Sequence, residues 1–222
     1  MQYGISILLS GISLGGQYAL IAIGYTMVYG ILRLINFAHG DVFMVAGLMM
    51  VYLSASLPLA AAIPLMIILT VLLGFIIERA AYKPLRTAPR MSVMISAIGV
   101  SYLLQNLATY VTGGLPQMYP ALPGLSNQLT IAGVSTKYVT VVTPVLVVLL
   151  VAALTQLINH TRIGMAMRAV SRDFETAQLM GIRINSVISV TFIIGSLLAA
   201  IGSLLYFTNC LLYTSPSPRD RG

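Results

Sequence analysis

Charged residues are scarce in this chain. They make up 8% of its 222 residues, whereas a soluble domain typically carries about 25%. Apolar residues make up 58%, and the mean hydropathy is +0.94. The composition therefore excludes a water-soluble fold and predicts a membrane protein.

The sequence also lacks the motifs of an enzyme. It has no Walker phosphate-binding loop, so the energy for any active transport must come from a separate subunit. Its histidines, carboxylates and serines form no clustered catalytic set. His39 and His160 lie on different loops, with no carboxylate or cysteine to complete a metal site. We therefore expect no catalysis, no cofactor and no bound metal.

Long apolar runs dominate what is present. A spanning helix needs roughly 20 mostly apolar residues. The runs are continuous, whereas barrel strands alternate polar and apolar residues, so they predict helices. The expected fold class is an all-α, polytopic transmembrane helix bundle with about six spans. These spans are residues 5–32, 42–57, 59–77, 92–111, 139–158 and 187–207.

Two of these runs depart from a simple span. The first is longer than a bilayer requires, so either the helix tilts or Gly15 and Gly16 separate a short interfacial piece from the true span. The second, residues 42–57, is short. Pro58 and Pro64 follow it and predict a broken or partial helix, which needs cover from protein or a water-filled cavity.

Basic residues predict the orientation. They crowd two loops, after the third and the fifth span, and Lys137 stands alone in the loop of residues 113–137. The positive-inside rule places both basic loops in the cytoplasm and the loop of residues 113–137 outside. Counting back puts Arg33 inside and the N-terminus outside. The two basic clusters are Arg79, Lys83, Arg86 and Arg90, and Arg162, Arg168, Arg172 and Arg183.

The net charge of +7 thus reflects topology. The basic residues lie beside membrane spans and are not interleaved with aromatic residues, so nucleic-acid binding is excluded as a function. The bilayer is the expected environment of the chain.

Polar residues concentrate where the first two spans meet. Asn36, His39 and Asp41 supply donors and acceptors, and Gly40 permits a tight turn or a close backbone approach. Polar groups inside a membrane usually mark a functional site, so a helix break here can line a solute pathway. Alternatively, these residues only stabilise a turn at the cytoplasmic surface. We favour that alternative for Asp41, at a helix N-terminus, and leave both open for Asn36 and His39.

Gln105 and Asn106 lie within the fourth span. Their amides are unfavourable against lipid, so we expect them to point at another helix or at the solute pathway. The sixth span carries Gly195, Ala199 and Ser203 at every fourth position, which predicts a face for close helix packing.

Residues 171–183 have the pattern of a short cytoplasmic helix. Asp173 can cap its N-terminus, Glu175 lies favourably in the first turn, and Gly181 can end it in the left-handed conformation. A capped helix between two spans makes a rigid protrusion.

One face of this short helix carries Phe174, Ala177 and Gln178. We expect these residues to enter a groove on a soluble partner. The alternative is an amphipathic helix that rests on lipid headgroups through Arg168, Arg172 and Arg183.

The C-terminal tail differs in character from the rest. After Phe207 the chain changes to a polar stretch rich in Pro and Ser, which resembles a translated sequencing adaptor; the alternative is a disordered native terminus. We expect a partial permease domain in residues 1–209 and a non-native or disordered tail in residues 210–222. The natural protein would then continue into further helices, and Cys210 would support no disulfide, thiol or metal argument.

Seven segments resemble LivH-type permeases of branched-chain amino-acid ABC importers, and they occur in the order found in that family. They are residues 16–30 (GQYALIAIGYTMVYG), 35–41 (INFAHGD), 78–86 (ERAAYKPLR), 95–99 (ISAIG), 104–106 (LQN), 162–169 (RIGMAMRA) and 177–182 (AQLMGI).

The resemblance implies a multi-pass subunit of the bacterial inner membrane that translocates branched-chain amino acids by alternating access. It implies that the subunit lies in the lipid bilayer and has three kinds of protein partner: a second, LivM-like permease, cytoplasmic ABC ATPases and a periplasmic substrate-binding protein. The short helix that contains Asp173 would be its ATPase-coupling helix. Urea or amide permeases of the same family are an alternative, as is a secondary transporter or channel for a small neutral solute. The sequence offers no mid-span carboxylate chain of the kind that proton-coupled carriers use.

Overall fold

The computed structural model describes residues 2–33, 35–85, 88–115, 117, 119–120, 128–131 and 134–210, and the statements below concern these residues. The tail predicted for residues 210–222 lies almost wholly outside them. Six helices are long and apolar enough to cross a membrane, which confirms the predicted helix bundle. They are α1 (Gln2–Leu32), α2 (Ala38–Ser56), α3 (Leu59–Ile77), α4 (Arg90–Thr112), α5 (Tyr138–His160) and α8 (Ile184–Cys210).

Neither suspected interruption is present. Helix α1 runs unbroken through Gly15 and Gly16, and α2 is a continuous helix that already begins at Ala38. In hydrocarbon every backbone polar group must be bonded internally, so the backbone stays helical through residues that would weaken a helix in water. Pro58 is the N-cap of α3, and Pro64 lies in its second turn. The prolines therefore mark the start of α3 and do not break α2.

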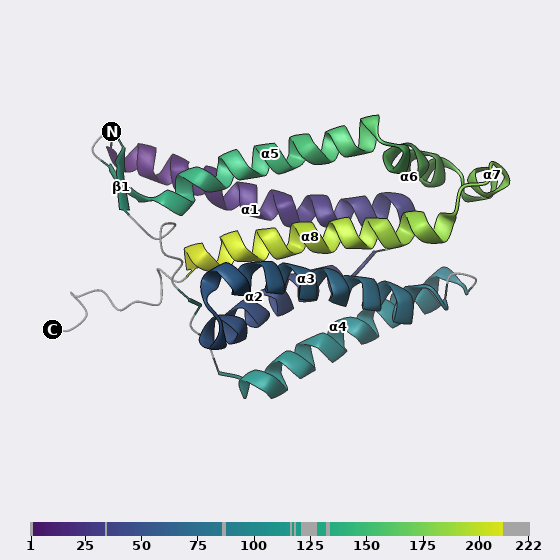
Figure 1. The fold of residues 1–222 in the computed structure, drawn as a ribbon, viewed down its shortest axis with the longest axis horizontal. Coiled ribbons are helices and arrows are strands. Elements are labelled where there is room, and N and C mark those ends of the chain that lie inside the picture. Colours follow the sequence, from purple (N-terminus) through teal and green to yellow (C-terminus); the bar gives the residue numbers. More distant parts are fainter. Residues whose placement is uncertain are drawn as a thin grey trace.

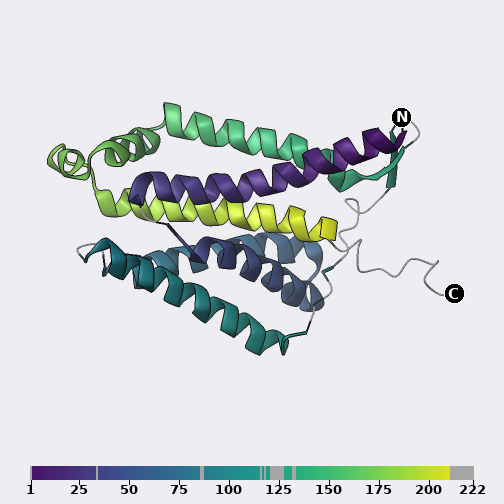
Figure 2. The ribbon, with the colours of Figure 1, turned by 180° about the vertical axis from the view of Figure 1, so that it is seen from behind.

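Helix α8 is the centre of the bundle. It lies between the pair α1 and α5 on one side and α2 and α3 on the other (Figure 1 and, from behind, Figure 2). Ala199, Ala200 and Ser203 are completely buried. Close approach continues at Gly74 of α3, where an added Cβ would collide with the side chain of Ser196. The predicted small-residue face is thus used for packing within the subunit.

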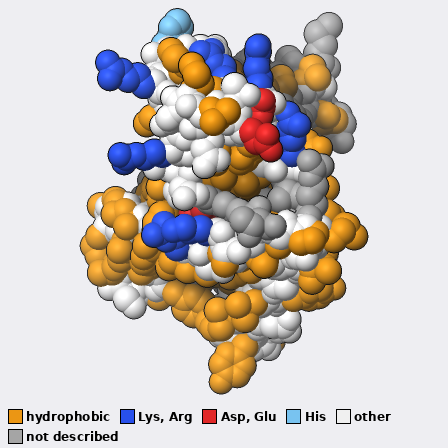
Figure 3. Space-filling model, turned by 90° about the vertical axis from the view of Figure 1, so that its right-hand side faces the viewer, with side chains coloured by type: hydrophobic (Ala, Val, Ile, Leu, Met, Phe, Trp, Pro, Cys, Tyr) orange, Lys and Arg blue, Asp and Glu red, His pale blue; other side chains and the backbone are white. Residues whose placement is uncertain are grey.

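The two ends of the bundle differ in charge. At one end lie α6 (Arg162–Arg172), α7 (Phe174–Leu179) and a short π-helix, η1 (Glu78–Tyr82), that continues α3. Figure 3 looks at this end, where Lys and Arg side chains gather. We call it the basic end. It corresponds to the cytoplasmic side of the predicted topology.

The opposite end holds the N-terminus and a two-stranded antiparallel hairpin, β1 (Gln128–Ile131) and β2 (Val134–Lys137) (Figure 1). Gln128 pairs with Lys137, and Ile131 with Val134. The sequence analysis did not foresee this hairpin, because strands of four residues inside a long loop leave almost no periodic signal.

A sharp corner joins α5 to α6. The Thr161 hydroxyl accepts a hydrogen bond from the Gly164 amide at 3.0 Å, which caps the N-terminus of α6. A Cβ added to Gly164 would collide with the backbone carbonyls of Leu157 and Ile158. The turn therefore requires glycine at this position.

Gly164→Ala should destabilise the protein by about 1–3 kcal/mol, because backbone atoms cannot move aside as a flexible side chain can. Thermal unfolding in detergent measures the effect. Gly99→Ala is the matched control, since an added Cβ at Gly99 meets no described atom. Equal melting temperatures for the two variants would contradict the steric argument.

Candidate translocation site and coupling segment

The connection between α1 and α2 folds back into the bundle. Arg33, just after α1, has a φ of +52°, which reverses the chain direction. His39 then lies against Gly24 of α1. At a rise of 1.5 Å per residue, Gly24 is about 12 Å along the helix from Leu32. The polar side chains that follow Arg33 are therefore inside the protein and not at its surface.

Asn36 is buried, at 4% exposure, and accepts a hydrogen bond from the Tyr82 hydroxyl at 2.8 Å. Tyr82 ends η1, and its ring packs against Phe192 of α8. Its hydroxyl thereby holds the α1–α2 connection to the end of α3. The sequence analysis missed Tyr82, because neither hydropathy nor spacing distinguishes it from other tyrosines of the chain.

His39 is 3% exposed and fills the space that two glycines leave free. A Cβ on Gly24 would lie 2.8 Å from its Nε2, and one on Gly195 would lie 3.7 Å from its Cε1. The Nε2 atom of the imidazole has no hydrogen-bond partner among the described residues. His39 is thus packed where α1, α2 and α8 meet.

Asp41 lies in the first turn of α2, as expected for a helix N-terminus, but it is buried at 7% exposure. Its Oδ1 accepts a hydrogen bond from Gln105 Nε2 at 2.9 Å, and the same amide donates to Ser101. The structure thus joins two predicted site residues from different helices. Asn106 is exposed and donates to the carbonyl of Tyr102 in its own helix, so it joins no other predicted residue.

Gly40 does not have the predicted conformation. It is exposed, helical and within α2, and an added Cβ would meet no described atom. The break in the helix lies earlier, between Arg33 and Phe37. The chain reverses at a non-glycine residue, so a sequence prediction that looked for glycine placed the turn wrongly at Gly40.

Glu78 is a second buried carboxylate, at 0% exposure, and its Oε2 accepts a hydrogen bond from the Ser189 hydroxyl at 2.8 Å. It opens η1, and π-helical turns within helices are frequent at functional sites. The carboxylate links the end of α3 to α8.

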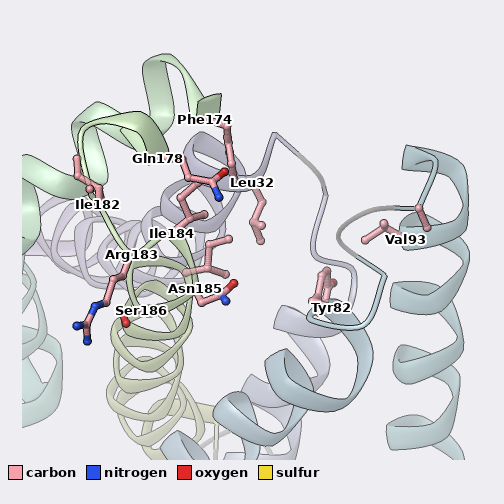
Figure 4. Close-up of a pocket in the computed structure, with 13 residues that line it drawn as sticks. Leu32, Tyr82, Val93, Phe174, Gln178, Ile182, Arg183, Ile184, Asn185 and Ser186 are labelled. Atoms are coloured by element: carbon pink, nitrogen blue, oxygen red, sulfur yellow. The ribbon is translucent and has the colours of Figure 1, made fainter. Parts of the chain in front are cut away.

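A cavity of about 660 Å³ opens at the basic end. Figure 4 shows Leu32 and residues of α7 and α8 on one side of it, and Tyr82 and Val93 on the other. Phe174 and Gln178 of α7 line the same space as Tyr82. The cavity thus lies between α7 and the residue that holds Asn36.

Helix α7 has the caps that the sequence predicts. Asp173 accepts from the Glu175 amide at 3.0 Å, and Gly181 has a φ of +80°. The amide of Gly181 donates to Gln178, and that of Ile182 to Ala177, which is the Schellman pattern. The Thr176 hydroxyl chiefly holds the pKa of Asp173 below its usual range.

The orientation of α7 differs from the expectation. Ala177 is 4% exposed, and Phe174 packs against the core of the bundle. Of the face predicted for a partner, Phe174 and Ala177 therefore point inward, whereas Gln178 is exposed. The apolar side chains that point outward are Leu179 and Met180, at 87% and 79% exposure. The orientation was not predicted because α7 packs on α6, a separate helix that the sequence analysis did not identify.

Comparisons with known proteins identify the family. A family model described as the permease component of branched-chain amino acid transport systems matches residues 7–216. The chain belongs to this permease family. The BraD permease of Pseudomonas aeruginosa is 40% identical over 211 residues, covering 89% of this chain and 69% of the relative. The LivH permeases of Salmonella typhimurium and Escherichia coli K12 are 40% and 39% identical over 219 residues, covering 91% of this chain and 70% of each relative.

No solved structure matches this permease. The resemblance seen in the sequence is confirmed, and six membrane-capable helices agree with a multi-pass membrane protein. The buried polar contacts at Asn36, Asp41 and Glu78 are thus features of a transport subunit.

Tyr82→Phe tests the bond to Asn36 in the permease. The change leaves the buried Asn36 oxygen without its donor, which destabilises the conformation that this bond holds by about 1–3 kcal/mol. We expect a loss of this size to lower transport by about tenfold. Solute uptake per assembled complex measures the effect. Tyr102→Phe, on the exposed side of α4, is the control. If uptake and assembly fell together, the hydrogen bond between Tyr82 and Asn36 would have a structural role only.

Proposed function

We propose that this permease is the membrane-spanning subunit of an ABC importer that moves branched-chain amino acids across the bacterial inner membrane by alternating access. The observation that carries the proposal is the α1–α2 connection, which brings Asn36, His39 and Asp41 into the bundle interior. Irregular backbone at membrane depth is tolerated where it is covered by protein or lines a cavity, and it is a common device for solute recognition. The relatives named above are branched-chain amino acid permeases, which supports this cargo.

The lining of a groove beside the connection also supports the cargo. This groove, of about 510 Å³, is bounded by His39 and Gly40 and by apolar side chains that include Ile21, Tyr25 and Phe37. The lining is mostly apolar, and such a surface suits the aliphatic side chain of a branched-chain amino acid. Urea, the cargo in the alternative, offers no aliphatic group to such a lining.

Helix α7 at the basic end supports ATP hydrolysis by a separate subunit as the energy source. A transporter that draws on ATP bound elsewhere needs a rigid element that passes the movement of the ATPase to its helices. Helix α7 is short, capped at both ends and in contact with α6 and α8. We infer that two cytoplasmic ABC ATPases dock here, that a LivM-like second permease completes the pathway, and that a periplasmic binding protein delivers the solute.

The test is leucine uptake into proteoliposomes that contain this permease with the partner subunits encoded by adjoining genes. We expect uptake that requires ATP and loaded binding protein, and no competition by excess urea. Competition by urea but not by isoleucine would favour the amide alternative. Full transport by the permease without ATPases would overturn the importer.

Leu179→Ala combined with Met180→Ala should weaken ATPase binding by tenfold or more, since burial of one such side chain contributes about 1.5–3 kcal/mol. Both side chains are exposed at the C-terminal end of α7, so their loss should leave the fold intact. Titration of the purified ATPase measures the affinity. Leu72→Ala, on the exposed face of α3, is the control, and an unchanged affinity in the double variant would place the docking surface elsewhere.

A further inference from the structure

Arg33 connects two segments that are far apart in sequence. Its Nη2 donates hydrogen bonds to the backbone carbonyls of Ser171 and Arg172, each at 3.0 Å. These two residues end α6, and Arg33 itself begins the α1–α2 connection. One guanidinium nitrogen therefore joins the polar connection to the last turn of the helix that precedes α7.

Helix physics accounts for these bonds. The last carbonyls of a helix have no partner within it, and they lie at the negative end of the helix dipole. A guanidinium group can donate hydrogen bonds to these carbonyls with a fixed geometry, and its permanent positive charge is favourable at the negative end of the dipole. Asp173 follows directly and caps α7. The end of α6, the start of α7 and Arg33 thus meet at one point.

The backbone of Arg33 is unusual. A φ of +52° is unfavourable for a residue with a Cβ, and such conformations persist where the surrounding contacts determine them. Here the contacts lie on both sides: Arg33 is bonded to α6, and Asn36, three residues later, is bonded to Tyr82 of η1. The connection is fixed at each end to a different element.

The bonds of Arg33 are exposed to solvent. Exposed charge contacts contribute little to stability, so the contact is a poor device for holding the fold together. It is better suited to linking the movements of two segments.

We propose that Arg33 is a positioning residue that makes the α1–α2 connection move together with α6 when the ATPases displace α6 and α7. This rests on the proposed function, since it requires an ATPase docked at the basic end. A movement of α6 then reaches Asn36 and His39 through the guanidinium group and the short connection, without passing through the apolar core.

Spin-label distances test the joint movement in the assembled complex. Labels at Phe37 and Met165, both exposed, report the separation of the connection from α6 once Cys210 is replaced by Ser. We expect the same separation without nucleotide and with ATP and vanadate. In Arg33→Gln the separation should differ between the two states. A separation that changes in the parent complex, or that stays constant in Arg33→Gln, would overturn the proposal.

Transport provides the second readout. Arg33→Gln should lower the leucine imported per ATP hydrolysed by about tenfold, a typical size for coupling between two sites, with basal ATP hydrolysis retained. Arg33→Lys, which keeps the charge and a donor, should recover part of this ratio. Arg79→Gln is the charge-matched control at the same end of the bundle.

An unchanged import ratio in Arg33→Gln would contradict the linkage. If Arg33→Gln fails to assemble, the distances in the parent complex still decide, since a changing separation refutes joint movement and a constant one supports it. Failure of the parent complex to import leucine would overturn the cargo alone, because the spin-label distances require no cargo.

Discussion

The structure depends on one constraint: backbone and side-chain polar groups inside a membrane bundle must find partners in the protein itself. A continuous helix meets it automatically, whereas the α1–α2 connection does not. It is sustained because η1 offers Tyr82 to Asn36 and α4 offers Gln105 to Asp41. Each of these partners comes from a different element. An irregular connection is therefore possible only where several elements of the bundle surround it.

Two buried carboxylates each accept a hydrogen bond from a neutral donor. Asp41 accepts from an amide and Glu78 from a hydroxyl. A bond of this kind orients a carboxylate without the desolvation of a second charge, which a buried ion pair requires. It can also be exchanged for a bond of similar strength to another donor. That property suits a pathway whose residues face different neighbours in successive states.

The sequence was sufficient for the membrane spans and for the ends of α7. Long apolar runs are a strong signal, and Asp173 and Gly181 act through local backbone geometry that residue type alone predicts. It was not sufficient where a choice depends on distant partners. Gly40 seemed the natural place for a reversal, yet Arg33 makes it, because bonds to α6 are available there. Likewise, the inward direction of Ala177 follows from packing against α6 and α8.

The same reasoning explains why the end of α6 and the α1–α2 connection lie together. Helix α6 ends with unpaired carbonyls at the basic end, and α1 ends there as well. The chain could satisfy those carbonyls with water, but a side chain from the α1–α2 connection does so instead. A contact that adds little stability yet joins the end of α6 to the connection that precedes buried Asn36 is understandable if its benefit is mechanical, as we propose above. In our proposal the end of α6 is the point at which a movement enters the α1–α2 connection.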